Sequence, residues 1–405
     1  YPPSQGEGEL KYGVTYTVWI PDDVKTIRAV IVHQHGCGGG ACRGGQTAAF
    51  DLHWQALARK HHCALLGPSY HQPEGADCRL WCDPRNGSRT TFLRALDDLS
   101  QASGHAELAH VPWCLWGHSG GAFWSSLMQT SDPQRIVAVW LRSGTAYAAW
   151  EKGEIPKPEL SAAVFQIPVA FNPGFKEKMH ARFNGAWNGA ASMYQAYRQQ
   201  GAPVLFAPDP HTAHECGDSR YLAIRFFDAH LRALGDAATS GPIPRATTQV
   251  EFALAAEEFP TLEGVIDGPI KIHPDLLDAW KQYVQTAEVA DDSPPAAPYD
   301  VRVAALAPSV NEIRWRADAD LESGLMQFEI LRDGKTIARY PEQPRNPFGK
   351  PLFQGMSYHD TPETPLRLMR YVDPDVPSGD EHVYQIVATN GAGLSSPPSA
   401  GGSSL

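Results

Sequence analysis

A serine flanked by glycines is the sequence's clearest chemical signal. The stretch LWGHSGGAF forms a GxSxG motif in which Gly117 and Gly121 surround Ser119, between an apolar strand-like run and an amphipathic stretch. A nucleophilic serine at a sharp turn from strand to helix needs small neighbours, because larger side chains would collide there. The motif therefore predicts that Ser119 is a nucleophile. A glycine-rich helix start capped by a serine is the alternative interpretation.

A second glycine-rich segment could stabilise negative charge. In IVHQHGCGGGACRGG an apolar run leads into a loop that contains Cys37. Acyl-transfer enzymes bind the oxyanion with two preorganised N–H groups, and we predict the main-chain N–H groups of Gly120 and Cys37 for this role. His33 and His35 share one face of the predicted strand and could instead bind a metal, but no third ligand is evident. We expect neither a metal nor a cofactor.

The elements that would position these residues follow a regular order. Between residues 14 and 234, short apolar runs alternate with longer amphipathic stretches, which is typical of βαβ units and a mostly parallel sheet flanked by helices, an α/β fold. The predicted strands are 14–20 at an edge, 29–33, 63–66, 113–116, 136–141, 169–171 and 204–207. The predicted helices are 47–60, 90–102, 121–129, 190–199 and 220–234.

The chain divides into two domains and a connector. We predict a catalytic domain at 1–235, a connector at 236–292 of uncertain structure that could pack on it, and an all-β domain at 293–405. The connector contains one plausible helix at 274–285. Beyond it the hydrophobic period changes to two, which predicts a β-sandwich with strands at 300–305, 311–316, 327–332, 335–340 and 382–389. A long insertion at 341–374 leaves the strand count open.

Composition and cysteine positions restrict the possible partners and the cellular location of the protein. The 405 residues include 45 acidic and 34 basic ones, and the net charge of -11 argues against a nucleic-acid partner. The longest apolar runs are strand-sized, so we expect no membrane span. Four of the seven cysteines occupy loop-like sequence that favours disulfides over the rival zinc site. The expected disulfides and a first residue other than Met together predict a secreted or periplasmic protein. These cysteines are Cys37, Cys42, Cys78 and Cys82; Cys63 and Cys114 are expected to be buried.

From about residue 12 to 234 the chain resembles the extracellular α/β-hydrolases, a group with polyester depolymerases, feruloyl esterases and acetylxylan esterases. The His35-Gly36-Cys37 segment is similar to the oxyanion loop of lipases and esterases. The C-terminal domain resembles a fibronectin type III module, on the evidence of Trp315, Tyr384 and the closing stretch ATNGAGLSSPPS. The resemblance implies a serine hydrolase that needs no cofactor.

The same resemblance implies where the other catalytic residues lie. In this fold the acid and then the histidine follow the serine in the chain. An acid three residues beyond Gly174 maps to Glu177, and a histidine shortly before the last long helix maps to His214. We therefore predict Ser119, His214 and Glu177 as a catalytic triad. Weaker candidates for the acid are Glu151 and Glu154; candidates for substrate binding are His118, Trp124 and His211.

These predictions combine into one leading function and two alternatives. The leading function is hydrolysis of carboxylic esters through an acyl-enzyme, on small esters or on bulky or polymeric ones of the polyester, feruloyl or acetyl-xylan type. The first alternative is a peptidase of the prolyl-oligopeptidase kind, which uses the same triad. The second is a binding protein that kept the fold and lost catalysis. The C-terminal domain could be a spacer or make a weak carbohydrate or polymer contact.

Overall fold

A seven-stranded sheet forms the centre of the larger domain in the computed structural model, which describes residues 1–405 except 236–242, 246–247, 367, 379–380 and 404–405. The strand order is β1-β3-β2-β4-β5-β6-β7, with β1 antiparallel at the edge and all other neighbours parallel. The strands are β1 (Val14–Trp19), β2 (Ala29–Gln34), β3 (Cys63–Tyr70), β4 (Trp113–His118), β5 (Ile136–Arg142), β6 (Val169–Asn172) and β7 (Val204–Phe206).

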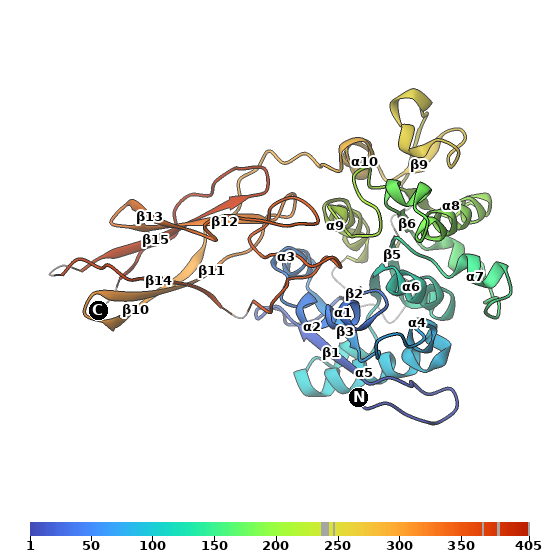
Figure 1. Cartoon of the computed structure of the whole chain (residues 1–405), viewed down its shortest axis with the longest axis horizontal. Coiled ribbons are helices and arrows are strands. Elements are labelled where there is room, and N and C mark those ends of the chain that lie inside the picture. Colours follow the sequence, from blue (N-terminus) through green and yellow to red (C-terminus); the bar gives the residue numbers. More distant parts are fainter. Residues whose placement is uncertain (236–242, 246–247, 367, 379–380, 404–405) are drawn as a thin grey trace.

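Helices cover both faces of this sheet (Figure 1). The helices α3 and α9 pack together over one face, and α6 and α8 lie over the other. The helices of this domain are α1 (Gly39–Arg43), α2 (Gly45–Ala48), α3 (Leu52–Lys60), α4 (Arg79–Cys82), α5 (Ser88–Ser103), α6 (Gly120–Ser131), α7 (Tyr147–Glu151), α8 (Asn184–Gln199) and α9 (Ser219–Leu231).

The segment from residue 250 to 287 shares the core of the first domain. It contains β8 (Val250–Phe252), β9 (Ile270–Ile272) and α10 (Leu277–Thr286), near the helix predicted at 274–285. Trp280 is fully buried and its Nε1–H donates to the Phe206 carbonyl at the end of β7. We therefore propose a domain division near residue 290. The predicted connector's residues 236–242 and 246–247 lie outside the described residues.

The C-terminal domain is a sandwich of two antiparallel sheets. One has the order β10-β11-β14 and the other β13-β12-β15-β16, around a separate core that includes Trp315, Phe328 and Tyr384. The strands are β10 (Tyr299–Ala307), β11 (Val310–Arg316), β12 (Leu325–Arg332), β13 (Lys335–Tyr340), β14 (Met369–Asp373), β15 (Val383–Asn390) and β16 (Gly402–Ser403). The predicted fold class, an α/β domain followed by a fibronectin III-like sandwich, is confirmed.

Two local differences from the prediction have clear causes. The helix predicted at 47–60 is split into α2 and α3, because Asp51 caps α3 by accepting hydrogen bonds from the N–H groups of His53 and Trp54. Strand β14 lies inside the range assigned to an insertion, which leaves 341–368 as the true insertion between β13 and β14.

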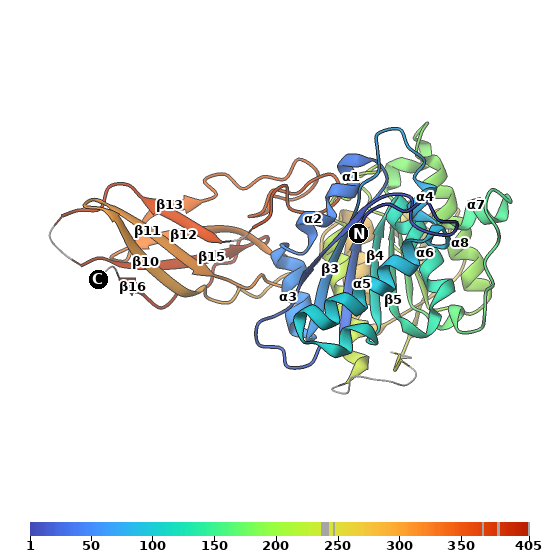
Figure 2. The same ribbon diagram turned by 90° about the horizontal axis from the view of Figure 1, so that it is seen from below.

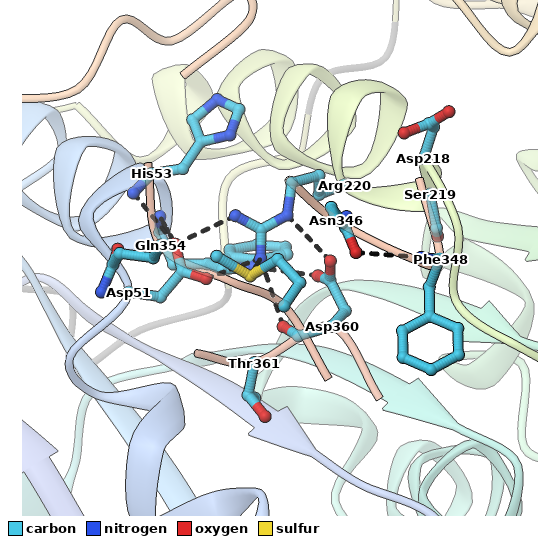
Figure 3. Close-up of polar contacts among 12 residues, drawn as sticks. Asp51, His53, Asp218, Ser219, Arg220, Asn346, Phe348, Gln354, Asp360 and Thr361 are labelled. Carbon is cyan, nitrogen blue, oxygen red and sulfur yellow. Dashed lines mark hydrogen bonds and ion pairs between the residues drawn. The ribbon is translucent and has the colours of Figure 1, made fainter. Parts of the chain in front are cut away.

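The insertion leaves the sandwich and lies along the first domain (Figures 1 and 2). Its contacts centre on Arg220 at the start of α9, whose side chain is 2% exposed (Figure 3). The guanidinium forms an ion pair with Asp51 of the first domain at 2.6 Å and with Asp360 of the insertion at 2.8 Å. Burial alone would lower the pKa of Arg220, but the two carboxylates raise it. Both domains therefore meet at one buried charge cluster.

Replacing this arginine tests how much the cluster contributes to stability. Arg220→Met keeps much of the side-chain volume but leaves two buried carboxylates without their cation. Removing one member of a buried ionic cluster typically costs about 3–5 kcal/mol, so we expect a loss of that order in urea unfolding at pH 7. Arg302→Met is the control, because Arg302 is 75% exposed and pairs with Asp300 at the surface; such pairs contribute about 0–1 kcal/mol. Equal losses in the two variants would contradict this interpretation.

The cysteines differ in part from the prediction. Cys37 and Cys78 form a disulfide, while Cys42 and Cys82 are buried free thiols within α1 and α4. The predicted loop character of the latter pair is wrong, because each lies in a short helix that turns its side chain inward. Cys63 and Cys114 are buried as expected. Within the described residues, no helix is both long and apolar enough to cross a membrane.

Candidate active site

Ser119 occupies a strained turn between β4 and α6. Its backbone angles are φ 54° and ψ -115°, an unfavourable conformation for a residue with a side chain. The Ser119 N–H donates to the Arg142 carbonyl of β5 at 2.9 Å, and the Ser119 carbonyl accepts from the Phe123 N–H of α6. The strand and the helix thus fix the turn on both sides, as a nucleophile elbow requires.

The three residues predicted as a triad form one hydrogen-bonded chain. His214 Nε2 lies 2.8 Å from Ser119 Oγ, and His214 Nδ1 lies 2.5 Å from Glu177 Oε1. Glu177 is fully buried, and the His214 side chain is 11% exposed. A carboxylate that accepts from Nδ1–H leaves the Nε2 lone pair facing the serine hydroxyl. This is the tautomer that a general base needs.

Main-chain contacts place Glu177 beside His214. Glu177 lies in a 3₁₀-helix, Phe175–Met179, directly after β6, and its Oε2 accepts from the Gly174 N–H at 3.1 Å. The Phe175 N–H donates to the Asp209 carbonyl at 2.8 Å, which ties this turn to the loop that carries His214. A Cβ on Gly174 would lie 1.9 Å from the Ala213 carbonyl oxygen, so only glycine allows this approach.

The loop that carries His214 is held by contacts with Arg142 and Phe183. Arg142 is fully buried at the end of β5, and its guanidinium donates to the Thr212 hydroxyl at 2.7 Å and to the Ala213 carbonyl at 3.3 Å. The Phe183 ring stacks on the His214 imidazole with centroids 4.0 Å apart and planes 2° apart. These contacts limit rotation of the His214 ring.

The predicted oxyanion donors lie next to each other. A Cβ placed on Gly120 would lie 3.3 Å from the Cys37 nitrogen and 2.2 Å from Cys37 Sγ. Gly120 begins α6, where N–H groups of the first turn lack intrahelical acceptors and the helix dipole favours negative charge. The Cys37–Cys78 disulfide joins the oxyanion loop to α4, with Cα atoms 5.6 Å apart. The loop is therefore covalently restrained.

A histidine of the C-terminal domain lies in the site, and no motif or spacing in the sequence predicts it. His359 Nδ1 lies 3.1 Å from His118 Nδ1, and His118 Nε2 lies 2.7 Å from the His214 carbonyl. Residues 358–360 also contact the first domain through the main chain, since the Cys216 N–H donates to the Tyr358 carbonyl at 3.0 Å. The insertion therefore touches the loop that carries the predicted base.

Buried histidines at the domain boundary predict sensitivity to acid. Burial, reinforced by Arg220, lowers the pKa of His53 to about 4, although Asp51 and Asp320 oppose this. Burial, with a smaller contribution from His214, also lowers the pKa of His359 to about 4. The ordinary histidine value is 6.5. Below that pH the unfolded chain binds more protons than the folded one, so stability falls as the pH drops from about 6.5 towards 4.

A single substitution can measure this effect. His53 Nε2–H donates to the Leu321 carbonyl of the second domain at 3.0 Å, and glutamine can keep that donor without titrating. Each such histidine adds a slope of up to about 1.4 kcal/mol per pH unit in this range. We expect His53→Gln to flatten the dependence of the urea midpoint on pH between 7 and 4.5. An unchanged slope would exclude His53 as a source of the acid sensitivity.

The remaining predicted site residues lie elsewhere. Trp124 is fully buried, donates from Nε1 to the Ser88 hydroxyl at 3.1 Å and packs against Phe92, so it belongs to the core instead of the substrate site. His211 is exposed, and its ring contacts the Thr286 carbonyl at the end of α10. His118 is fully buried between the loop that carries His214 and the insertion, and it contacts the His214 carbonyl on one side and His359 on the other.

The structure also shows where the alternative candidates for the acid and the two histidines considered as metal ligands lie. Glu151 pairs with Lys157 and Glu154 with Arg79, both at the surface. His33 and His35 are buried and contact each other at 3.3 Å. Among the described residues, the one group of side chains close enough to share a metal consists of Cys37, Cys78 and Cys82, two of which are disulfide-bonded. Asp360 Oδ2 lies 3.6 Å from His33 Nε2, but among the described residues no third His, Cys, Asp or Glu lies close enough to both histidines to share a metal with them.

Comparisons with known proteins found matches among solved structures alone. No protein-family model and no curated protein matches the chain. Among solved structures, an α/β hydrolase enzyme from a Medee basin deep-sea metagenome library is 19% identical over 51% of this chain and 80% of that chain, with a TM-score of 0.36. The acetyl xylan esterase from Aspergillus awamori is 11% identical over 50% of this chain and 89% of that chain, with a TM-score of 0.33.

The C-terminal domain has its own structural relatives. A stretch of domains from titin is 18% identical over 27% of this chain and 31% of that chain, with a TM-score of 0.18, so the present chain spans under a third of the titin fragment. At these identities the similarities concern the fold alone. The strand order defines the chain as an α/β-hydrolase-fold protein with a fibronectin III-like sandwich.

Proposed function

We propose that this protein is a serine hydrolase that cleaves carboxylic esters through an acyl-enzyme intermediate. The observation that carries the proposal is the continuous chain from Ser119 Oγ through His214 to the buried carboxylate of Glu177, with contacts of 2.8 and 2.5 Å. A serine in a strained turn, a histidine in the tautomer of a base and an acid that orients it are the components of nucleophilic acyl transfer.

The geometry supports the following sequence of steps. His214 Nε2 takes the proton of the Ser119 hydroxyl as Oγ attacks the ester carbonyl carbon. The negative charge on the carbonyl oxygen is bound by the N–H groups of Gly120 and Cys37. His214 then gives its proton to the departing alcohol oxygen, which leaves the acyl group on Ser119. Water, deprotonated by His214, attacks the acyl-enzyme and releases the carboxylic acid with the free serine.

Two apolar side chains that follow Glu177 in the chain and reach solvent support bulky or polymeric esters as substrates. Met179, two residues beyond Glu177, is 89% exposed, and Phe183, whose ring lies on His214, is partly exposed. Exposed large apolar side chains next to a reactive group suit a hydrophobic acyl chain or polymer surface. The Cys37–Cys78 disulfide supports action in an oxidising compartment such as the periplasm or the cell exterior. Carbohydrate or polymer binding by the sandwich stays a prediction.

The proposal is tested by covalent labelling of the intact protein. A fluorophosphonate probe should react at one serine, and mass spectrometry of the digest should place the label on the peptide that contains Ser119. In parallel, p-nitrophenyl acetate and butyrate should be hydrolysed, while a peptide p-nitroanilide should be cleaved much more slowly. Absence of both labelling and ester hydrolysis in a folded sample would overturn the proposal and favour the binding-protein alternative. Preferred cleavage of the anilide would favour the peptidase.

A further inference from the structure

The insertion of the C-terminal domain contacts two parts of the candidate active site at once. On one side, the His359 ring lies 6.4 Å from that of His35, the residue that directly follows β2 and leads into the loop of Cys37. On the other, the Tyr358 carbonyl accepts from the Cys216 N–H in the loop that carries His214. A segment of the second domain thus bridges the loop that contains Cys37 and the loop that carries His214.

Hydrogen-bond chemistry fixes the direction of the contacts in this bridge. A carbonyl oxygen only accepts, so His118 must carry its proton on Nε2 to bond the His214 carbonyl at 2.7 Å. A neutral His118 then has a lone pair on Nδ1. The neighbouring nitrogen, His359 Nδ1 at 3.1 Å, must therefore be the donor. Burial keeps the pKa of both rings below the ordinary value, which favours the neutral forms.

The turn that presents His359 is itself well ordered. The His359 N–H donates to the Ser357 hydroxyl at 3.2 Å, and the Ser357 N–H donates to the Thr361 carbonyl at 2.7 Å. The next residue, Asp360, is held by Arg220 of the first domain at 2.8 Å. Because both ends of the turn are bonded, the imidazole is directed at His118 with little freedom.

We propose that His359 is a positioning residue of the active site, which fixes the His118 ring and through it the main chain of His214, the base. The inference rests on the proposed function, since it assumes that His214 is the base. It assigns the sandwich domain a part in catalysis: its insertion completes the support of the catalytic loop. A displacement of the base by about 1 Å can cost up to about 100-fold in rate, so this support has a measurable consequence.

Substitutions at His359 in the full-length protein test the proposal. His359→Ala removes the donor and should lower kcat for p-nitrophenyl acetate by about 10-fold or more, with KM within about two-fold, because ground-state binding is not altered. His359→Asn places an N–H close to the position of Nδ1 and should restore most of the activity. His382→Ala is the matched control, since His382 lies in the same domain and pairs with Asp333; its kcat should equal that of the wild type.

A double-mutant cycle separates positioning from general stability. In His118→Gln, the side-chain Nε2–H can bond the His214 carbonyl without help from His359. The loss of kcat caused by His359→Ala should therefore largely disappear in the His118→Gln background. An additive loss, equal loss in the alanine and asparagine variants, or an unchanged kcat in His359→Ala would overturn the positioning role while the wild type remains an active esterase. A wild type that neither labels nor hydrolyses esters would instead overturn the proposed function, and this inference with it.

Discussion

Ser119→Ala is expected to lower kcat for p-nitrophenyl acetate by about 10⁶-fold and to abolish fluorophosphonate labelling, because loss of a triad nucleophile removes the covalent route entirely. The folded structure should persist. The main-chain bonds of the elbow, from Ser119 N–H to the Arg142 carbonyl and from Phe123 N–H to the Ser119 carbonyl, do not involve the hydroxyl. Steady-state kinetics, with a thermal melt of each sample, measures both effects.

The control for this experiment lies on the same helix. Ser131 ends α6, and its hydroxyl donates to the Leu127 carbonyl at 3.1 Å, away from the site. Ser131→Ala should label and hydrolyse esters as the wild type does. If Ser119→Ala kept more than about 1% of the wild-type kcat, another group would be the nucleophile and the proposed function would need a different centre.

Local sequence context was sufficient to predict the sheet and Ser119, whereas Glu177 and His214 were predicted from the resemblance to the α/β-hydrolases. Ser119, Glu177 and His214 lie one, five and eight residues beyond the ends of β4, β6 and β7, and the carboxyl ends of parallel strands meet at one edge of the sheet. Period and turn residues therefore predict the strands, and the chain order that the resemblance implies then selects Glu177 and His214 among the residues that follow them. The structure brings the three side chains into hydrogen-bond contact.

Contacts between distant segments could not be predicted in this way. His359 lies 241 residues from His118 in the chain and belongs to an insertion without any repeating pattern. Trp124 is predicted for substrate binding because its segment could border the site, but it lies on the face of α6 that packs against Ser88 and Phe92. Which face of a helix is buried depends on neighbours that the local sequence does not specify.

Glu177→Gln is expected to lower kcat by about 10⁴-fold while the protein keeps its fold. The amide has the same shape, and its oxygen can still accept from the Gly174 N–H, which now bonds Glu177 Oε2 at 3.1 Å. It no longer offers a carboxylate to His214 Nδ1–H, so the imidazole can adopt the wrong tautomer, and the imidazolium formed during attack loses its counter-charge. Kinetics with p-nitrophenyl acetate at pH 8 measures the loss.

Two further variants, Glu154→Gln and Asp209→Asn, decide how the effect of Glu177→Gln on kcat is interpreted. Glu154→Gln changes a carboxylate that is 42% exposed and pairs with Arg79, so kcat should not change. Asp209 is a buried acid in the loop that carries His214, but it accepts from the His211 N–H and faces Tyr283. A loss of less than about 10-fold in Glu177→Gln, with a large loss in Asp209→Asn, would transfer the role of the acid to Asp209. Because His214 Nδ1 already lies 2.5 Å from Glu177 Oε1, that transfer would require the base loop to rearrange before catalysis.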